Sequence, residues 1–176
     1  ISTGSYGNTQ TSEFKYANRS RYLRLDNIQE KKPDGSNYDA HTLYKTHYVG
    51  AYERVERTGG AGNQVEHKYQ IAGAVLTRKE GQSTFKTLFA HTDYQGSVIT
   101  VTDKVGTVAE QFIYDPWGKK TKVIISNTVA SLVSDLTRGS ATTRGYTGHE
   151  GIDHFNLIHM NGRVYDAEVG RFLQAD

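Results

Sequence analysis

The sequence predicts an all-β protein built from consecutive antiparallel hairpins, and three observations support this fold class. Eighteen glycines and only two prolines occur in 176 residues, so tight turns are frequent. Twelve tyrosines and six phenylalanines supply aromatic side chains that pack well on a pleated sheet. The turn pattern Asp-x-x-Gly occurs three times in close succession. Turn signals separated by strand-length segments are typical of a β-meander.

The repeated turn pattern has a physical reason at each position. An aspartate at the first position can accept hydrogen bonds from its own turn, and a glycine at the fourth tolerates a positive φ. Pro116, at the second position of the third copy, fixes φ near the value that a type I turn requires. The pattern predicts three hairpin turns, at Asp93–Gly96, Asp103–Gly106 and Asp115–Gly118.

Strand-length segments flank these turns. Residues 97–102 and 107–114 are rich in Val, Ile, Thr, Phe and Tyr, which favour strands. In residues 64–71 apolar or aromatic side chains alternate with polar ones, so we expect the apolar face inward and the polar face in water. The polar segment 30–37 is expected to form an exposed loop. Four further strands are predicted, at 43–49, 52–57, 74–78 and 85–90.

Two segments depart from the strand pattern and predict short helices. The first has apolar residues at the i, i+3, i+4, i+7 spacing of an amphipathic helix and covers 127–138. A second short helical turn is expected over 149–154. Strand-like residues return from 157 to 165, interrupted by Asn161-Gly162, a dipeptide typical of hairpin turns.

Charge and composition exclude several function classes. The formal charge of +2 arises from 21 basic and 19 acidic residues mixed along the chain, so neither nucleic acid nor an anionic membrane is expected as a partner. The absence of cysteine excludes disulfides, thiol catalysis and cysteine-ligated zinc. No apolar run approaches the ~20 residues of a membrane-spanning helix. Because Ile1 is not an initiator methionine, we expect an internal piece of a longer polypeptide.

Several segments together resemble the Rhs/YD-repeat family: His91–Val98, Phe112–Lys119, and Thr147–Asp166. The closing Gly170–Asp176 is similar to the opening of the family's repeat-associated core. One Tyr-Asp-x-x-Gly block alone would be weak evidence, whereas the ordered set is specific. The resemblance implies three regions, with YD repeats over 1–120, a connecting segment over 121–146 and the truncated start of the core over 147–176.

The resemblance implies a long β-sheet that spirals into a hollow shell. Such a shell encloses a variable C-terminal toxin of the same polypeptide, which is released by self-cleavage. The implied partners are that toxin, the neighbouring YD repeats and a secretion or toxin-complex component. The implied location is secreted or cell-surface associated, and no cofactor is expected.

The resemblance also implies candidate catalytic residues. The family's core often carries an intramolecular aspartyl protease with two Asp-Pro-x-Gly-like motifs, and Asp176 matches the first aspartate if proline follows it. Two carboxylates are needed, because like charges a few ångström apart keep one group protonated. The second lies outside this sequence, so the chain is not a complete enzyme. Arg163 occupies the position of an arginine that assists self-cleavage in related toxin-complex C components, with a structural salt bridge as the alternative.

Other chemistry is less well supported by the sequence. Histidine and carboxylate residues cluster within residues 149–159, but they do not follow the His-Glu-x-x-His pattern, so no metal site is predicted. Asp166 is explained by a turn over 166–170. No Gly-x-Ser-x-Gly elbow is present, which argues against a serine hydrolase. Beside the shell, two functions stay open: half of an aspartyl autoprotease, and a cell-surface adhesion or carbohydrate-binding module.

Overall fold

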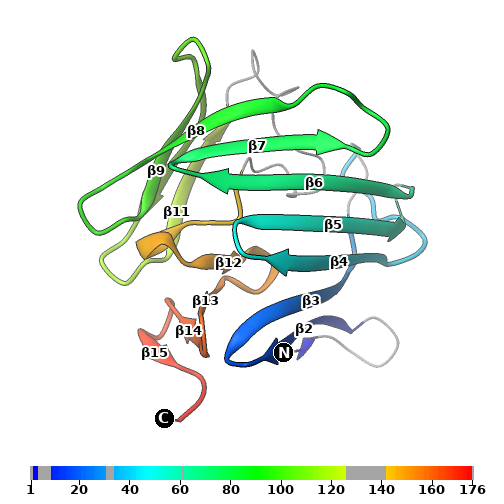
Figure 1. The fold of residues 1–176 in the computed structure, drawn as a ribbon. Coiled ribbons are helices and arrows are strands. Elements are labelled where there is room, and N and C mark those ends of the chain that lie inside the picture. The colour runs from blue at the N-terminus through cyan, green and yellow to red at the C-terminus, as the bar shows by residue number, and fades with distance from the viewer. Residues whose placement is uncertain (1, 4–8, 31–33, 61, 126–141, 176) are drawn as a thin grey trace. The chain divides into compact units, whose positions relative to one another are not determined.

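The computed structural model describes residues 2–3, 9–30, 34–60, 62–125 and 142–175, and the fold is all-β, as the sequence predicts (Figure 1). The chain divides into two compact units: Ile1–Gln70 with Thr77–Phe85, and Ile71–Leu76 with Lys86–Asp176. Helical structure among the described residues is limited to short 3-10 turns at Tyr146–Gly148 and Asp153–Phe155. In that same part of the chain, no helix is long and apolar enough to cross a membrane.

The first unit is a run of antiparallel strands in which each strand pairs with the next one along the chain. Its strands are β1 (Ser2–Thr3), β2 (Gln10–Ala17), β3 (Ser20–Ile28), β4 (Thr42–Val49), β5 (Tyr52–Gly59) and β6 (Gln64–Ile71). Figure 1 shows β4, β5 and β6 lying side by side. Strand β7 (Ala74–Lys79) contributes residues to both units.

Strand β6 has the predicted boundaries, but the prediction of its inward face is wrong. Glu66 and Lys68 are 1% and 0% exposed, whereas Ile71 is 55% exposed. Lys68 lies opposite Glu53 of β5 in the register, and the buried Glu53 accepts a hydrogen bond from Gln70 Nε2 at 2.7 Å. That hydrogen bond offsets part of the cost of burying the Glu53 carboxylate, whereas Lys68 Nζ is buried with no hydrogen-bond partner among the described residues. Polar side chains therefore form the inner face here.

The second unit begins with three hairpins. They are made of β8 (Lys86–Thr92), β9 (Val98–Asp103), β10 (Val108–Tyr114) and β11 (Lys120–Ile125), each antiparallel to the next. Each of these pairings contains one register shift, which is common where a three-residue turn ends in a glycine bulge. The hydrophobic core of this unit contains Leu88, Val98, Val101, Ala109 and Phe112.

The three predicted Asp-x-x-Gly turns close these hairpins with nearly identical geometry. Asp93 Oδ1 accepts hydrogen bonds from the backbone N–H groups of Gln95 and Ser97 at 2.9 and 2.8 Å. Asp103 and Asp115 accept the equivalent bonds, all at 2.9 Å. The three glycines have φ of +84°, +89° and +91°, in the left-handed region that glycine adopts readily. One side chain and one glycine therefore fix each turn.

The end of the described chain forms a four-stranded antiparallel sheet with its strands in chain order. Its strands are β12 (Glu150–Ile152), β13 (Leu157–Met160), β14 (Arg163–Asp166) and β15 (Arg171–Phe172). The predicted Asn161-Gly162 turn joins β13 to β14, with Asn161 at a positive φ of 57°.

The predicted helical turn over 149–154 is wrong for most of its length. Residues 150–152 form strand β12, paired with β13 through Glu150 opposite His159 and Ile152 opposite Leu157. Only the 3-10 turn Asp153–Phe155 is helical. Gly151 in the middle disfavours a helix, and pairing with β13 gives this segment a partner for its backbone. The helix predicted over 127–138 lies outside the described residues.

Candidate functional site

Two of the three Asp-anchored turns lie at the same end of the β8–β11 hairpins, because successive hairpin turns alternate between the two ends of a meander. These are the turns that begin at Asp93 and Asp115. Their middle positions carry aromatic side chains, Tyr94 and Trp117, which are 95% and 62% exposed. An end of the sheet with two exposed aromatic rings on rigid turns is a candidate binding surface.

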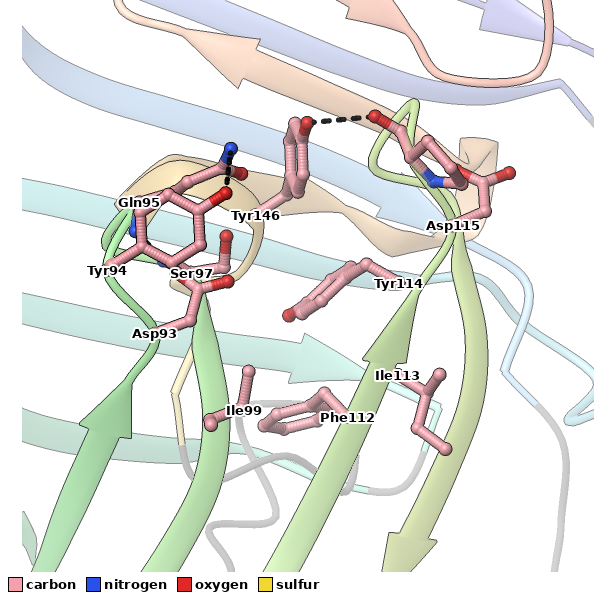
Figure 2. A pocket seen from close by; sticks show the side chains of 11 residues that line it. Asp93, Tyr94, Gln95, Ser97, Ile99, Phe112, Ile113, Tyr114, Asp115 and Tyr146 are labelled. Carbon is pink, nitrogen blue, oxygen red and sulfur yellow. Dashed lines mark hydrogen bonds between the residues drawn. The ribbon is translucent and has the colours of Figure 1, made fainter.

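A later segment of the chain packs against both turns. Tyr146 Oη donates a hydrogen bond to the carbonyl oxygen of Pro116 at 3.2 Å. The Thr147 N–H donates to Ser97 Oγ at 3.0 Å, and the Val98 N–H donates to the carbonyl oxygen of Gly145 at 3.1 Å. These bonds hold the Tyr146 ring between the two turns, as Figure 2 shows.

Together these elements line a groove that is open to solvent and has a volume of about 570 Å³ (Figure 2). Phe112 and Tyr114 of β10 lie along it, with Ile99 and Ile113 on neighbouring positions, and the two turns and Tyr146 form its rim. The lining combines aromatic and aliphatic side chains with the polar groups of a few residues. The polar residues are Asp93, Gln95, Ser97 and Asp115.

The electrostatics of the groove are acidic. Burial, together with the charges of Asp153, Asp93 and Glu110, raises the pKa of Tyr114 well above its ordinary value. Its hydroxyl is therefore neutral and donates a hydrogen bond to the carbonyl oxygen of Val98 at 3.1 Å. The groove lining includes aspartates and no lysine, arginine or histidine. The groove can thus contact a ligand through aromatic rings and hydrogen-bond acceptors, but its lining has no cationic side chain that could bind an anion.

Arg163, the arginine predicted to assist cleavage, lies in β14 beside the final described strand. Its guanidinium carbon is 3.8 Å from the centroid of the Phe172 ring. The Val164 N–H donates to Gln174 Oε1 at 2.7 Å, and the Leu173 N–H donates to the carbonyl oxygen of Val164 at 2.8 Å. These contacts tie the segment that approaches Asp176 to β14. Asp176 itself lies outside the described residues.

The remaining polar residues that the sequence singled out have structural contacts. Asp166 Oδ1 accepts a hydrogen bond from the Glu168 N–H at 2.9 Å, so the turn that explains it is confirmed. His149 Nδ1 lies 2.8 Å from Thr147 Oγ1, and burial and the nearby Arg144 lower the pKa of His149. Within the described part of the chain, no group of three or more histidine, aspartate or glutamate side chains could hold a metal ion.

The groove was missed by the sequence prediction. Its two turns were predicted individually, but Tyr146 comes from a distant part of the chain and completes the rim only after folding. The sequence did contain a signal for this groove. The middle positions of the first and third turns hold the aromatic residues Tyr94 and Trp117. The second turn, at the opposite end of the hairpins, holds Lys104 and Val105 instead.

The chain consists of consecutive hairpins with aspartate-anchored turns, followed by the small four-stranded sheet β12–β15. This arrangement defines a YD-repeat β-sheet protein. The chain belongs to the Teneurin YD-shell family, whose model matches residues 66–176. This assignment confirms the resemblance to the Rhs/YD-repeat shells.

Bacterial proteins and toxin assemblies are similar to this chain. The tRNA3(Ser)-specific nuclease WapA of Bacillus spizizenii is 26% identical over 118 residues, and the tRNA(Glu)-specific nuclease WapA of Bacillus subtilis subsp. natto is 28% identical over 91. These alignments cover 66% and 52% of the chain but only 4% of each relative.

Two solved structures share the fold over 99% of this chain and 8% of theirs. The crystal structure of TcdB2-TccC3-Cdc42 matches with a TM-score of 0.77 at 17% identity. A mutant Tc holotoxin pore of Photorhabdus luminescens matches with a TM-score of 0.74 at 16% identity. At this identity the likeness shows the fold, which is that of a YD shell.

Proposed function

We propose that this chain forms part of the wall of a hollow β-shell that encloses the toxin portion of the same polypeptide. The observation that carries the proposal is the series of hairpins with matching aspartate and glycine geometry in a member of the YD-shell family. Pairing each strand with the next leaves few exposed edges, which suits a wall that must not aggregate. The partners are then the toxin and the neighbouring YD repeats.

The named relatives support a toxic cargo and a place outside the producing cell. The WapA proteins are named as tRNA nucleases, and the structural relatives come from Tc toxin assemblies. We therefore assign the parent protein to the secreted or cell-surface class of toxin-delivery proteins. Within it, residues 1–120 form YD-repeat wall, 121–146 connect, and 147–176 begin the repeat-associated core.

Protease protection of the downstream segment tests enclosure. The full-length protein is treated with a protease, and the fate of the segment after residue 176 is followed by mass spectrometry. The native shell should protect this segment, and Asp115→Ala, which removes both side-chain bonds of a wall turn, should expose it. Asp34→Ala is the matched control, because Asp34 makes similar bonds to Ser36 in an exposed loop. Digestion of the downstream segment in the native protein as fast as in the urea-unfolded protein would refute enclosure.

The same proposal includes release of the cargo by self-cleavage. Asp176 is the candidate catalytic aspartate, paired with a second aspartate downstream, and Arg163 is the candidate positioning residue. The stacking of Arg163 on Phe172, in the strand that leads toward Asp176, supports a positioning role. The guanidinium would hold a carboxylate in place through charge-assisted hydrogen bonds.

Cleavage of the full-length protein tests these residues. Asp176→Asn should leave the polypeptide uncleaved, since an amide cannot share a proton as a carboxyl pair does. Arg163→Gln should slow cleavage and shift its pH profile, whereas a purely structural arginine would lower stability without moving that profile. Glu168→Gln, a nearby exposed control, should cleave normally. Unchanged cleavage in Asp176→Asn excludes Asp176 as a catalytic residue.

A further inference from the structure

A chain of hydrogen bonds joins Tyr52, His67 and Glu80 on the partly exposed face of β5 and β6. Tyr52 Oη lies 2.7 Å from His67 Nδ1, and His67 Nε2 is hydrogen-bonded to Glu80 Oε2. The strands fix this order, because Tyr52 of β5 lies opposite Tyr69 and thus diagonal to His67 of β6, within reach of an aromatic side chain. The Glu80 N–H donates to the carbonyl oxygen of Val65 at 2.8 Å, which holds the carboxylate beside β6. All three groups belong to the first unit.

The carboxylate of Glu80 determines which nitrogen of His67 carries the proton. The hydrogen bond to His67 lowers the pKa of Glu80, so this exposed side chain is ionised at neutral pH and can only accept. His67 Nε2 must therefore donate, which leaves Nδ1 of the neutral imidazole as the acceptor for the Tyr52 hydroxyl. A hydroxyl, a base and an orienting carboxylate in this order are the arrangement of an activated nucleophile.

The Tyr52 hydroxyl requires such a base. Burial raises the pKa of Tyr52, and Tyr69 adds to this effect. The positive charges of two arginines, Arg54 and Arg78, oppose it. The hydroxyl is therefore protonated at neutral pH, and it becomes a nucleophile only when its proton is transferred. His67 Nδ1 lies at hydrogen-bond distance to take that proton.

The same two arginines indicate the charge of a substrate. Arg54 lies directly opposite His67 and pairs with Glu56. Arg78 stacks over the Phe85 ring, with its guanidinium carbon 5.3 Å from the ring centroid. The described residues supply its guanidinium with neither a hydrogen-bond acceptor nor an ion pair. One guanidinium without an anionic partner matches the single negative charge of a phosphodiester. Because basic and acidic residues are mixed along the chain, a small phosphodiester fits this site better than a nucleic acid.

We propose that Tyr52 is a nucleophile that accepts the phosphoryl group of a small phosphodiester, with His67 as its general base. Glu80 positions His67, and Arg78 binds the phosphate oxygens. In this step the Tyr52 proton moves to His67 Nδ1, a bond forms between Tyr52 Oη and phosphorus, and the bond from phosphorus to the leaving oxygen breaks. The leaving group departs with the electron pair of that bond, and the phosphate keeps its negative charge beside Arg78. His67 then releases its proton to water. This activity does not depend on the proposed enclosure of a toxin.

The reaction of the full-length protein with bis(4-nitrophenyl) phosphate tests this site. We expect a stoichiometric burst of 4-nitrophenolate and a phosphodiester adduct on the peptide that contains Tyr52, located by mass spectrometry. Tyr52→Phe should abolish both, and His67→Gln should slow the burst at least about tenfold. Arg78→Gln should raise the diester concentration that gives the half-maximal burst rate. Glu80→Gln should shift the pH profile of the burst, whereas a purely structural contact would affect stability without moving that profile.

His47→Gln is the matched control. His47 lies opposite Arg54 on the neighbouring strand β4, and its Nε2 lies 3.6 Å from Glu56 Oε1. Within the described part of the chain no tyrosine hydroxyl is bonded to it, so this variant should react like the native protein. Circular dichroism checks the folding of each variant.

Three outcomes would overturn the proposal: no adduct on the native protein, an adduct on a residue other than Tyr52, or equal burst rates in His67→Gln and the native protein. Toxin enclosure is read separately by protease protection. A result of either sign with the diester therefore leaves that proposal to its own experiment.

Discussion

Gly118→Ala probes the contact that completes the groove. Gly118 has φ of +91°, and an added Cβ would lie 2.4 Å from Cδ1 of the Tyr146 ring. Gly106, at the same position of the second turn, has φ of +89° but no atom within 4 Å of the equivalent Cβ. The two substitutions therefore impose the same backbone strain, and only Gly118→Ala displaces Tyr146.

The structure sets the size of each effect. Alanine in the left-handed region costs about 1–2 kcal/mol, so Gly106→Ala should lower the free energy of unfolding by about that amount. Overpacking adds about 1–3 kcal/mol at Gly118, because the ring must shift or its hydrogen bond to Pro116 must break. In a Tyr146→Ala background the ring is absent. Gly118→Ala should then lower the free energy of unfolding by only the ~1–2 kcal/mol that alanine in the left-handed region costs.

Urea unfolding of the four variants, followed by Trp117 fluorescence and circular dichroism, measures these differences. The double-mutant cycle isolates the coupling between residues 118 and 146. The packing of the Tyr146 ring on the turn would be refuted if Gly106→Ala and Gly118→Ala lowered the free energy of unfolding equally. It would also be refuted if Gly118→Ala lowered it by the same amount with and without Tyr146.

Three further effects are expected. Tyr114→Phe removes the hydrogen bond to Val98 and should lower the free energy of unfolding by about 0.5–1.5 kcal/mol, and an unchanged urea midpoint would contradict that bond. Asp103→Ala should lower the urea midpoint while Asp103→Asn, which keeps an acceptor, recovers most of it; similar midpoints for both would refute the turn mechanism. Burial and Arg144 lower the pKa of His149 below that of unfolded histidine, about 6.5. The contribution of His149 to the free energy of unfolding should thus be fully present above pH ~6.5. It should fall toward pH ~5, because the unfolded chain binds a proton at this histidine more readily than the folded protein does. His149→Gln should flatten this fall relative to the native protein, and an identical pH profile would contradict the assignment.

The sequence predicted the parts of the fold that depend on local chemistry. The Asp-x-x-Gly turns were predictable because aspartate and glycine act within their own turn. The inward face of β6 was not, because the side of a strand that is buried depends on the elements packed around it and not only on its own alternation of apolar and polar residues. The helical turn over 149–154 failed for a related reason, since β13 supplies the partner that makes Glu150–Ile152 a strand.

The candidate site residues show the same difference between local contacts, which the sequence predicts, and long-range contacts, which it does not. The turn role of Asp166 followed from its own neighbours, whereas the groove required Tyr146 to pack between two turns about 30 and 50 residues earlier in the chain. Arg163 was named from a family position, and its contact with Phe172 could be seen only once β14 and β15 were paired.

An experimental structure of the full-length protein by electron cryomicroscopy tests the central claim most directly. The account predicts that the hairpins from β2 to β11 form part of a continuous wall around an enclosed volume, and that this volume holds density for the segment after residue 176. A full-length structure in which this segment lies in open solvent, or in which the hairpins enclose no volume, would contradict it.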